Sequence, residues 1–310
     1  MSRFIVRRFA AMILVMVLLT MIVFGLSHAT GDPRYMYMSE YSTGSTSAEM
    51  WEAQGKRLGL DKPLHIQYGL WLGRSLKGDF GTSLTYNKNS IDVISEGLTG
   101  TLQLTSVSFV FAILLGVPLG VLSAVKRATF WDYLGRSFAL IGQSAPPFWI
   151  AIVCIFVFAV YLGWLPTSRR GDWTHYVLPV ITLGWMPASA LLRLVRSSTL
   201  EVLDSEFVKL AKAKGVSNTT VIWKHAFRNS LIAPLTFTMV LLAGFLTGTV
   251  VTETVFAWPG LGRMAVRAAL NMDFPLITAL AMVFGLMFLF TSFIADVIYG
   301  LVDPRIRYDR

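Results

Sequence analysis

The side chains with the most chemical potential lie together in residues 211–229, which read AKAKGVSNTTVIWKHAFRN. Lysines, a histidine and an arginine stand there among small and aromatic residues, around a glycine that permits a turn. Two helices joined through a glycine turn form the outline of a DNA-binding helix-turn-helix, whose basic side chains would contact phosphates. Nucleic-acid binding is therefore the first chemistry that this stretch suggests.

Other reactive groups are few. The single cysteine, Cys154, excludes an internal disulfide, and its place inside an apolar run indicates simple packing. A phosphate-cradling GxxxxGK[ST] pattern does not occur. Asp296 and Asp303 are expected to be acidic groups near a helix end, where a carboxylate costs less than the roughly 2.5–3.5 kcal/mol of a bilayer-centre position. We predict no catalytic residue and no metal ligand in this chain.

Membrane-spanning helices are the elements that must position these residues. Hydrophobic residues make up 54% of the chain and charged residues only 15%, against about 25% charged in typical soluble domains. Six runs of about 17 or more residues lack Asp, Glu, Lys and Arg, which is enough helix to cross a hydrocarbon core of about 30 Å. The runs are residues 9–27, 97–125, 137–163, 176–192, 229–252 and 274–295. The predicted fold is an all-α polytopic membrane protein with six transmembrane helices.

The first run has an alternative interpretation as a signal peptide. The segment SRFIVRR is basic, and Ser27-His28-Ala29 resembles a cleavage site. The apolar stretch of 19 residues is longer than the usual signal core of about 7–15. We therefore expect a retained N-terminal transmembrane helix over residues 1–28.

The distribution of basic residues predicts the orientation. Of the 27 Lys and Arg residues, 16 lie on the side of the two termini, in short segments that include the 193–228 loop. Short loops decide orientation, so the termini and this loop are expected on the cytoplasmic side of the membrane. The overall charge of +9 then needs no nucleic acid to explain it.

The remaining organisation follows from this map. Residues 29–98 are expected to form an extracytoplasmic subdomain of short helices, because Ile66 and Leu70 have helical spacing. Residues 99–302 form a five-helix core that contains the cytoplasmic loop 193–230, and residues 303–310 form a cytoplasmic tail. The segment QSAPPFW (143–149) predicts a kink or break, either for packing or to line a pathway.

The spans also limit what the 211–229 stretch can do. The segment from Arg193 to Arg228 is only 36 residues long, and residues 201–230 carry a net charge of only +2. A DNA reader needs freedom to enter a groove and a strongly basic surface. A short helix pair tied to two spans is better suited to transmitting a push, and the alternative is an amphipathic helix on the bilayer surface. The runs between Thr99 and Asp296 hold no ionisable carboxylate or base, and the GxxxxGK[ST] pattern is missing, so if the protein pumps a solute the energy comes from another polypeptide.

A family resemblance agrees with this interpretation. EFVKLAKAKGVSNTTVIWKHAFRNSLIAP resembles the cytoplasmic coupling loop of ATP-binding-cassette importer permeases, in particular those of the dipeptide, oligopeptide and nickel family. The resemblance covers essentially the whole chain through an ordered series of motifs. They include GDP (31–33), LGLDKP (58–63), GDFGTS (78–83), GVPLGVLSA (116–124), LGWLPTS (162–168), VLPVITLG (177–184), ETVFAWPGLGRM (253–264), MDFP (272–275) and LVDPRIRY (301–308).

The loop departs from the general importer pattern of Glu-Ala-Ala, three residues and Gly. Lys209 stands in place of the Glu and Leu210 in place of the first Ala, while Ala211 and Gly215 match. Arg228 replaces a late Pro, and the peptide branch of the family is similar in these respects. The residues expected to couple to an ATPase are Lys209, Ala211, Ala213, Lys214, Gly215, Ser217, His225 and Arg228.

A second candidate segment follows the fifth span. It lies at the extracytoplasmic mouth, and its Trp-Pro-Gly turn with a large aromatic is suited to plugging a path or meeting a binding protein. The alternative is a loop that only packs the span ends. The expected gate residues are Glu253, Trp258, Pro259, Gly260 and Gly262.

The resemblance implies the fold of a type I importer permease in the inner membrane of a prokaryotic cell, with no enzymatic chemistry and no cofactor in this chain. It implies a second permease subunit that forms a heterodimer with this one, two ATPase subunits that hold ATP and Mg, an extracytoplasmic solute-binding protein and membrane lipid. The solute stays open among dipeptides, longer peptides, glutathione and nickel chelates. The alternatives are a stand-alone secondary transporter or channel, disfavoured by the uncharged spans, and more distantly a DNA-binding sensor.

Overall fold

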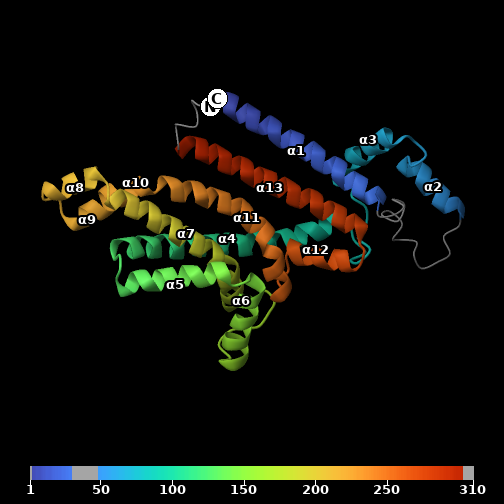
Figure 1. Cartoon of the computed structure of the whole chain (residues 1–310). Coiled ribbons are helices and arrows are strands. Elements are labelled where there is room, and N and C mark those ends of the chain that lie inside the picture. Colours follow the sequence, from blue (N-terminus) through green and yellow to red (C-terminus); the bar gives the residue numbers. More distant parts are fainter. Residues whose placement is uncertain (1, 30–47, 303–310) are drawn as a thin grey trace. The chain divides into compact units, whose positions relative to one another are not determined.

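The computed structural model describes residues 2–29 and 48–302, and these residues are helical apart from their turns and one isolated bridge between Thr82 and Asn89 (Figure 1). The helices are α1 (Ser2–Ala29), α2 (Ala48–Leu58), α3 (Leu64–Ser75), α4 (Ser90–Val125), α5 (Phe130–Ser144), α6 (Pro147–Cys154), α7 (Thr174–Leu203), α8 (Glu206–Ala213), α9 (Asn218–Thr220), α10 (Arg228–Ser230), α11 (Ile232–Val255), α12 (Leu261–Leu270) and α13 (Phe274–Val302). Two π-helical segments, Ile155–Tyr161 and Val221–Phe227, continue α6 and α9.

The predicted all-α membrane fold is confirmed. Within the described residues, α1, α4, α7 and α13 are long and apolar enough to cross a membrane alone. Two further apolar helix pairs are bent, by 110° between Ser144 and Pro147 and by 50° near Leu231. Counting each bent pair as one span gives the six expected from the sequence.

The sharper bend falls in the QSAPPFW segment, as predicted. Ala145 and Pro146 have extended backbone between α5 and α6. The two adjacent prolines have no N–H to donate, and each disfavours helical backbone in the residue before it. The expected third run therefore consists of two helices at a steep angle rather than one straight span.

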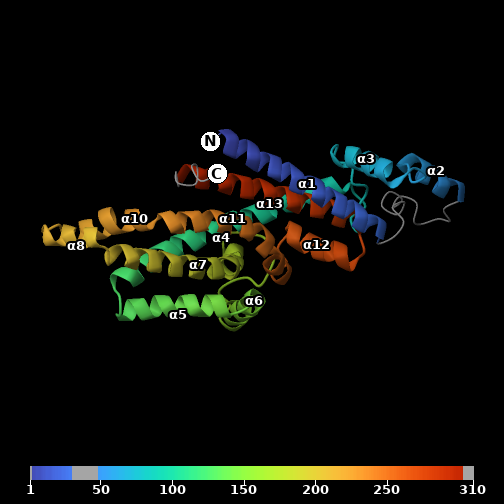
Figure 2. The same ribbon diagram turned by 45° about the horizontal axis from the view of Figure 1, so that its top comes forward.

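The described chain divides into two compact units. The first holds residues 102–258 and 291–302, and the second holds residues 2–101 and 259–290. In the first unit α7 packs against α5, α6 and α11. Figures 1 and 2 both show α7 alongside α5 and α11, with α8 beyond one end of α7; Figure 1 shows α9 next to α8.

Close backbone contact joins α4 to α7 within the first unit. A Cβ added to Gly116 would lie 2.7 Å from the carbonyl oxygen of Ala188, and one added to Gly120 would lie 2.8 Å from that of Leu192. Side chains at these two positions would push the helices apart, so glycine is required here for space.

The second unit has its own apolar core, built from α1, α3, α12 and the first parts of α4 and α13. Phe24, Tyr68 and Trp71 form an aromatic group, with ring centroids 5.5 Å apart for Phe24 and Tyr68. The Thr20 and Tyr68 hydroxyls share a hydrogen bond of 2.7 Å. The short helix expected from the spacing of Ile66 and Leu70 is present as α3.

Candidate functional site

The loop between α7 and α11 is itself helical and turns back at Gly215. This residue has a φ of +78°, where a β-carbon is strained, although open space surrounds it. Glycine is thus required here for conformation rather than for space. After the turn, the Ser217 hydroxyl accepts a hydrogen bond of 3.4 Å from the Thr220 N–H, which caps the next helix.

Three buried side chains hold this loop together. Val208 of α8 and Val221 and Ala226 of the following π-helical segment have no exposed surface. The hydroxyl groups of Thr199 in α7 and Ser230 in α10 share a buried hydrogen bond of 3.2 Å. The loop is therefore a folded unit attached to α7 at its base.

Large apolar side chains nevertheless remain on the outside of the loop. The exposed fractions of Phe207, Leu210 and Trp223 are 47%, 57% and 57%. Trp223 contacts only the edge of Phe227 among the described rings, at a centroid distance of 5.4 Å. Phe207 and Leu210 lie three positions apart in α8 and so share one face of the helix, and contiguous apolar patches of this kind commonly mark contact sites for other molecules.

Most of the residues expected to couple lie on this outer surface. Ala211 and His225 are half-buried, whereas the exposed ones are Lys209, Ala213, Lys214, Gly215, Ser217 and Arg228. Lys209 forms an ion pair of 2.8 Å with Glu206, one turn earlier. The side chain that replaces the family's glutamate therefore has an acidic partner in its own helix.

A buried charge pair lies below the loop, and sequence analysis missed it. The Arg196 guanidinium donates two hydrogen bonds to the Asp132 carboxylate, of 2.7 Å from Nε to Oδ1 and 3.0 Å to Oδ2. Ser123 Oγ and the Ala128 N–H also donate to Asp132, at 2.6 and 3.0 Å. Asp132 is 1% exposed, so the pair joins α4, α5 and α7 firmly at one point.

The expected third and fourth runs did not include Asp132 and Arg196, because each run was defined as a stretch without Asp, Glu, Lys or Arg. In the structure α5 begins at Phe130 and α7 continues to Leu203, so both ends carry ionisable groups. The available signal was an acid at the start of one apolar run and arginines just after another, on the same predicted side of the membrane.

The gate segment from Glu253 to Trp258 belongs to the first unit and buries three of its six residues, Glu253, Phe256 and Trp258. Glu253 and Trp258 have no exposed surface. The rings of Trp258 and Tyr176 form a T-shaped pair with centroids 4.7 Å apart, and the Tyr176 hydroxyl donates a 3.0 Å hydrogen bond to Gln103. Trp258 is thus packed inside its own chain, among residues of α4, α7 and α11.

Backbone hydrogen bonds fix the turn that carries this tryptophan. The Trp258 N–H donates to the Glu253 carbonyl at 2.8 Å, and the Arg169 N–H donates to the Phe256 carbonyl at 2.8 Å. Ala257 has a φ of +49°, an unfavourable value for a residue with a side chain.

The rest of the segment, residues 259–262, belongs to the second unit. Pro259 is exposed, whereas Gly260 and Gly262 are buried. The Leu261 N–H donates to Thr101 Oγ1 at 2.8 Å at the start of α12.

Asp273 is a second buried acid that sequence analysis did not identify. Its carboxylate accepts hydrogen bonds from Ser83 Oγ at 2.5 Å, the Thr85 N–H at 2.9 Å and the Leu276 N–H at 3.2 Å. It therefore caps the start of α13 and ties it to residues 83–85. An aspartate directly before an apolar run is the sequence signal for such a cap.

The remaining candidates lie elsewhere. Asp296 is half-buried within α13, and Asp303 lies outside the described residues. Cys154 is buried and free. Within residues 2–29 and 48–302, no three His, Cys, Asp or Glu side chains are grouped so that they could hold a metal ion.

Apolar helices long enough to cross a membrane, with a folded polar loop fixed to their ends, define an integral membrane protein. Residues 116–308 match the family described as the binding-protein-dependent transport system inner membrane component, and residues 1–105 match the N-terminal part of such membrane components. The chain belongs to this family. The resemblance to importer permeases is confirmed.

Relatives along the whole length are permease proteins. The glutathione transport system permease protein GsiC of Salmonella typhimurium is 37% identical over 310 residues, which covers 99% of this chain and 100% of the relative. GsiC of Escherichia coli K12 is 36% identical over the same shares. The dipeptide transport system permease protein DppB of Alkalihalophilus pseudofirmus is 35% identical over 331 residues, or 97% of this chain and 98% of the relative.

Solved structures share the fold at lower identity. An inward-facing methionine ABC transporter, MetNI, aligns with a TM-score of 0.56 and 19% identity over 68% of this chain and 96% of its own. An amino acid ABC transporter with bound histidines gives 0.56 and 13% identity over 68% and 94%. The fold is thus that of an ABC transporter permease rather than of a stand-alone transporter.

Proposed function

We propose that this chain is the permease subunit of an ATP-driven importer for a peptide-like solute such as a dipeptide or glutathione. The observation that carries the proposal is the folded loop with its exposed apolar surface, formed by Phe207, Leu210 and Trp223. A permease whose sequence has no phosphate-binding GxxxxGK[ST] loop can be driven by ATP only through contact with an ATPase subunit, and such a surface would provide that contact. The names of its full-length relatives support the solute class.

Coupling is proposed to run through the base of this loop. An ATPase subunit docks on the loop tip around Ala213 and Gly215 and displaces it as ATP binds. The Asp132–Arg196 pair, with hydrogen bonds of 2.7 and 3.0 Å, passes this displacement to α4 and α5 together with α7. Breaking a buried charge pair is costly, so the three helix ends move as one body.

The gate is proposed to work from inside the permease. Trp258 has no exposed surface and is packed on Tyr176 of α7 and beside α4 and α11. Motion of these helices would therefore shift the tryptophan and open or close the path. Direct contact of Trp258 with a binding protein is less well supported, because its side chain is not on the surface of the described chain.

The assembly is proposed to hold a second permease subunit of similar fold, two ATPase subunits with ATP and Mg, and an extracytoplasmic binding protein. The chain lies in the inner membrane, with both termini on its cytoplasmic side and residues 29–98 on the opposite side. Lys77→Cys and Ser217→Cys each place a thiol at an exposed position. An impermeant thiol reagent should react with the first from outside intact spheroplasts, and with the second only when the cytoplasmic face is turned outward in inverted membrane vesicles. Reaction of both from one side contradicts this orientation.

Transport by the reconstituted complex tests the proposed function. Proteoliposomes with the permease, its partner subunits and ATP inside should accumulate radiolabelled dipeptide or glutathione only when the binding protein is present outside. An ion gradient without ATP should give no uptake. Uptake driven by the gradient, or uptake by this chain alone, would disprove the importer assignment.

One pair of variants tests the coupling surface. Ala213→Glu places a charge on the exposed tip and should abolish uptake, while Ala213→Ser keeps the side chain small and should preserve it. Both variants should insert and assemble, because the residue lies outside the apolar spans. Full transport by Ala213→Glu with the ATPases bound would make the amphipathic surface helix the better account.

A further inference from the structure

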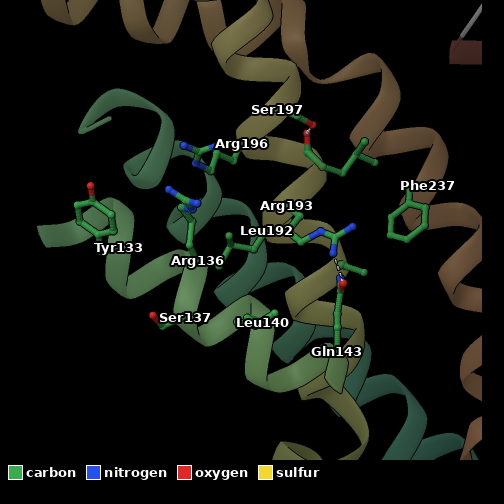
Figure 3. Close-up of a pocket in the computed structure, with 12 residues that line it drawn as sticks. Tyr133, Arg136, Ser137, Leu140, Gln143, Leu192, Arg193, Arg196, Ser197 and Phe237 are labelled. Atoms are coloured by element: carbon green, nitrogen blue, oxygen red, sulfur yellow. Dashed lines mark hydrogen bonds between the residues drawn. The ribbon is translucent and has the colours of Figure 1, made fainter. Parts of the chain in front are cut away.

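A cavity of about 750 Å³ lies between α5 and α7, separate from both the coupling surface and the gate segment. Ligand pockets commonly measure about 300–1,000 Å³, so its volume suits a small ligand or the headgroup of a larger one. The side chains that matter for its chemistry are Arg136, Leu140, Gln143, Arg193, Arg196 and Phe237. Figure 3 shows Arg193 reaching from α7 toward Gln143 and Phe237, while Arg136 extends from α5 on the side of Tyr133.

The three arginines of this cavity differ in how their charge is balanced. Arg196 is neutralised by the buried carboxylate of Asp132. Arg193 donates a hydrogen bond to the neutral amide oxygen of Gln143. The Arg136 guanidinium lies 5.8 Å from the ring centroid of Tyr133, a weak cation–π contact. Among residues 2–29 and 48–302, neither Arg136 nor Arg193 forms an ion pair, so the cavity keeps two unbalanced positive charges.

The surroundings of the cavity indicate its depth in the membrane. Exposed aromatic side chains crowd the start of α5, where Phe130, Trp131 and Tyr133 are 70%, 51% and 58% exposed. Such aromatic groups are typical of the level at which a helix crosses the lipid headgroups. Lys126 and Arg127 precede the same helix. The cavity therefore opens near the headgroup level on the basic side of the protein.

We propose that this cavity binds the headgroup of an anionic phospholipid, with Arg136 and Arg193 on the phosphate and Leu140 and Phe237 along the acyl chains. The planar guanidinium matches phosphate oxygens in pairs, and an unbalanced arginine within an apolar helix is costly without such a partner. Basic pockets between membrane helices on the cytoplasmic side suit this class of lipid. A carboxylate of the solute has the same charge, but the apolar rim beside the arginines favours a ligand with acyl chains.

Lipid association of the assembled complex tests this proposal. The complex is placed in nanodiscs that contain spin-labelled phosphatidylglycerol or spin-labelled phosphatidylcholine, and the immobilised fraction is measured by electron spin resonance. The native complex should prefer phosphatidylglycerol. Arg136→Gln and Arg193→Gln should each lower the relative association of phosphatidylglycerol about tenfold, as expected for loss of one charged hydrogen-bonding partner.

A matched control and a cavity-filling variant make the test specific. Arg127→Gln removes an exposed arginine on the same side, outside the cavity and paired with Asp204 at 3.3 Å, and it should leave the preference unchanged. Leu140→Trp fills the cavity, keeps every charge and should lower the preference as well. If loss of an arginine prevents assembly of the complex, Leu140→Trp still tests whether the cavity binds the lipid.

Four outcomes overturn the proposal. One is equal association of the two lipids with the native complex, and another is an effect of Arg127→Gln as large as that of the cavity variants. The third is displacement of spin-labelled phosphatidylglycerol by glutathione or a dipeptide, which would assign the cavity to the solute. A lipid preference that persists in both cavity arginine variants contradicts the proposal equally.

Discussion

The two segments that flank α11 bury their apolar side chains in opposite ways. Before α11, the loop that contains α8 leaves Leu210 and Trp223 each 57% exposed. After it, the gate segment buries Phe256 and Trp258 almost completely, at 1% and 0% exposed. Burial in a single chain thus separates an element that is packed within its own unit from one that leaves apolar side chains free for the docking proposed above. Substitution in the first should act mainly through stability, and substitution on the outer surface of the second mainly through function.

The largest expected effect is at the gate. Trp258→Ala should lower the free energy of unfolding by about 3–5 kcal/mol, because it removes a fully buried aromatic side chain. It should also change the ATPase activity that the loaded binding protein stimulates. Trp258→Phe keeps part of the ring contact with Tyr176 and should be milder. Thermal unfolding of the purified complex measures the first effect. Unchanged stability would show that burial of Trp258 does not distinguish the gate segment from the loop before α11.

The buried charge pair should come next. Asp132→Asn keeps the shape but leaves the Arg196 guanidinium without its counter-charge, at a cost of about 3 kcal/mol. Adding Arg196→Gln should recover part of this loss, since no buried charge then lacks a partner. If the loss of unfolding free energy in the double mutant equals the sum of the losses in the two single mutants, the two residues act independently and the pair does not stabilise the fold.

The turn of the coupling loop should show a moderate effect on stability and a large one on transport. Gly215→Val forces a β-branched side chain to a φ of +78°, which costs about 1–3 kcal/mol or moves the loop tip. Gly215→Asn tolerates this conformation better and is the matched control. Solute uptake by proteoliposomes should fail for valine and persist for asparagine. Equal uptake by both would show that the turn geometry does not matter for coupling.

The smallest expected effect is at the exposed ion pair. Lys209→Ala removes the contact with Glu206, whose side chain is 90% exposed, so stability should change by less than about 0.5 kcal/mol. Any loss of ATPase binding in pull-down assays would then come from contact with the partner. A clear loss of thermal stability would instead place Lys209 among the residues that hold the loop together.

The sequence predicts the apolar interior of each span well, because charge-free runs reflect the membrane directly. It predicts the ends poorly. Asp132 and Arg196 lie inside α5 and α7, yet they fall outside the expected runs because a paired charge at a helix end is compatible with the membrane. Their pairing joins residues 64 positions apart, and no local pattern encodes it.

Proline shows the same limit on prediction. Pro179 and Pro187 remain inside α7, whereas Pro146 and Pro147 separate two helices at 110°. The bend near Leu231 was not expected, although Pro234 removes a donor and crowds the carbonyl of Ser230 four residues earlier. Whether a single proline bends a span depends on packing against neighbouring helices, which sequence alone does not contain.

The close approach of α4 to α7 has a mechanical consequence. Gly116 and Gly120 belong to a longer row of small buried residues on α4, spaced four apart, which runs Ser108, Ala112, Gly116, Gly120 and Ala124. Large interlocking side chains would give the two helices a single register. A row of small residues instead lets one helix tilt against the other with little steric hindrance. The contact that holds the first unit together can therefore also serve as a pivot, about which α7 tilts against α4 while the Asp132–Arg196 pair keeps the ends of these helices joined.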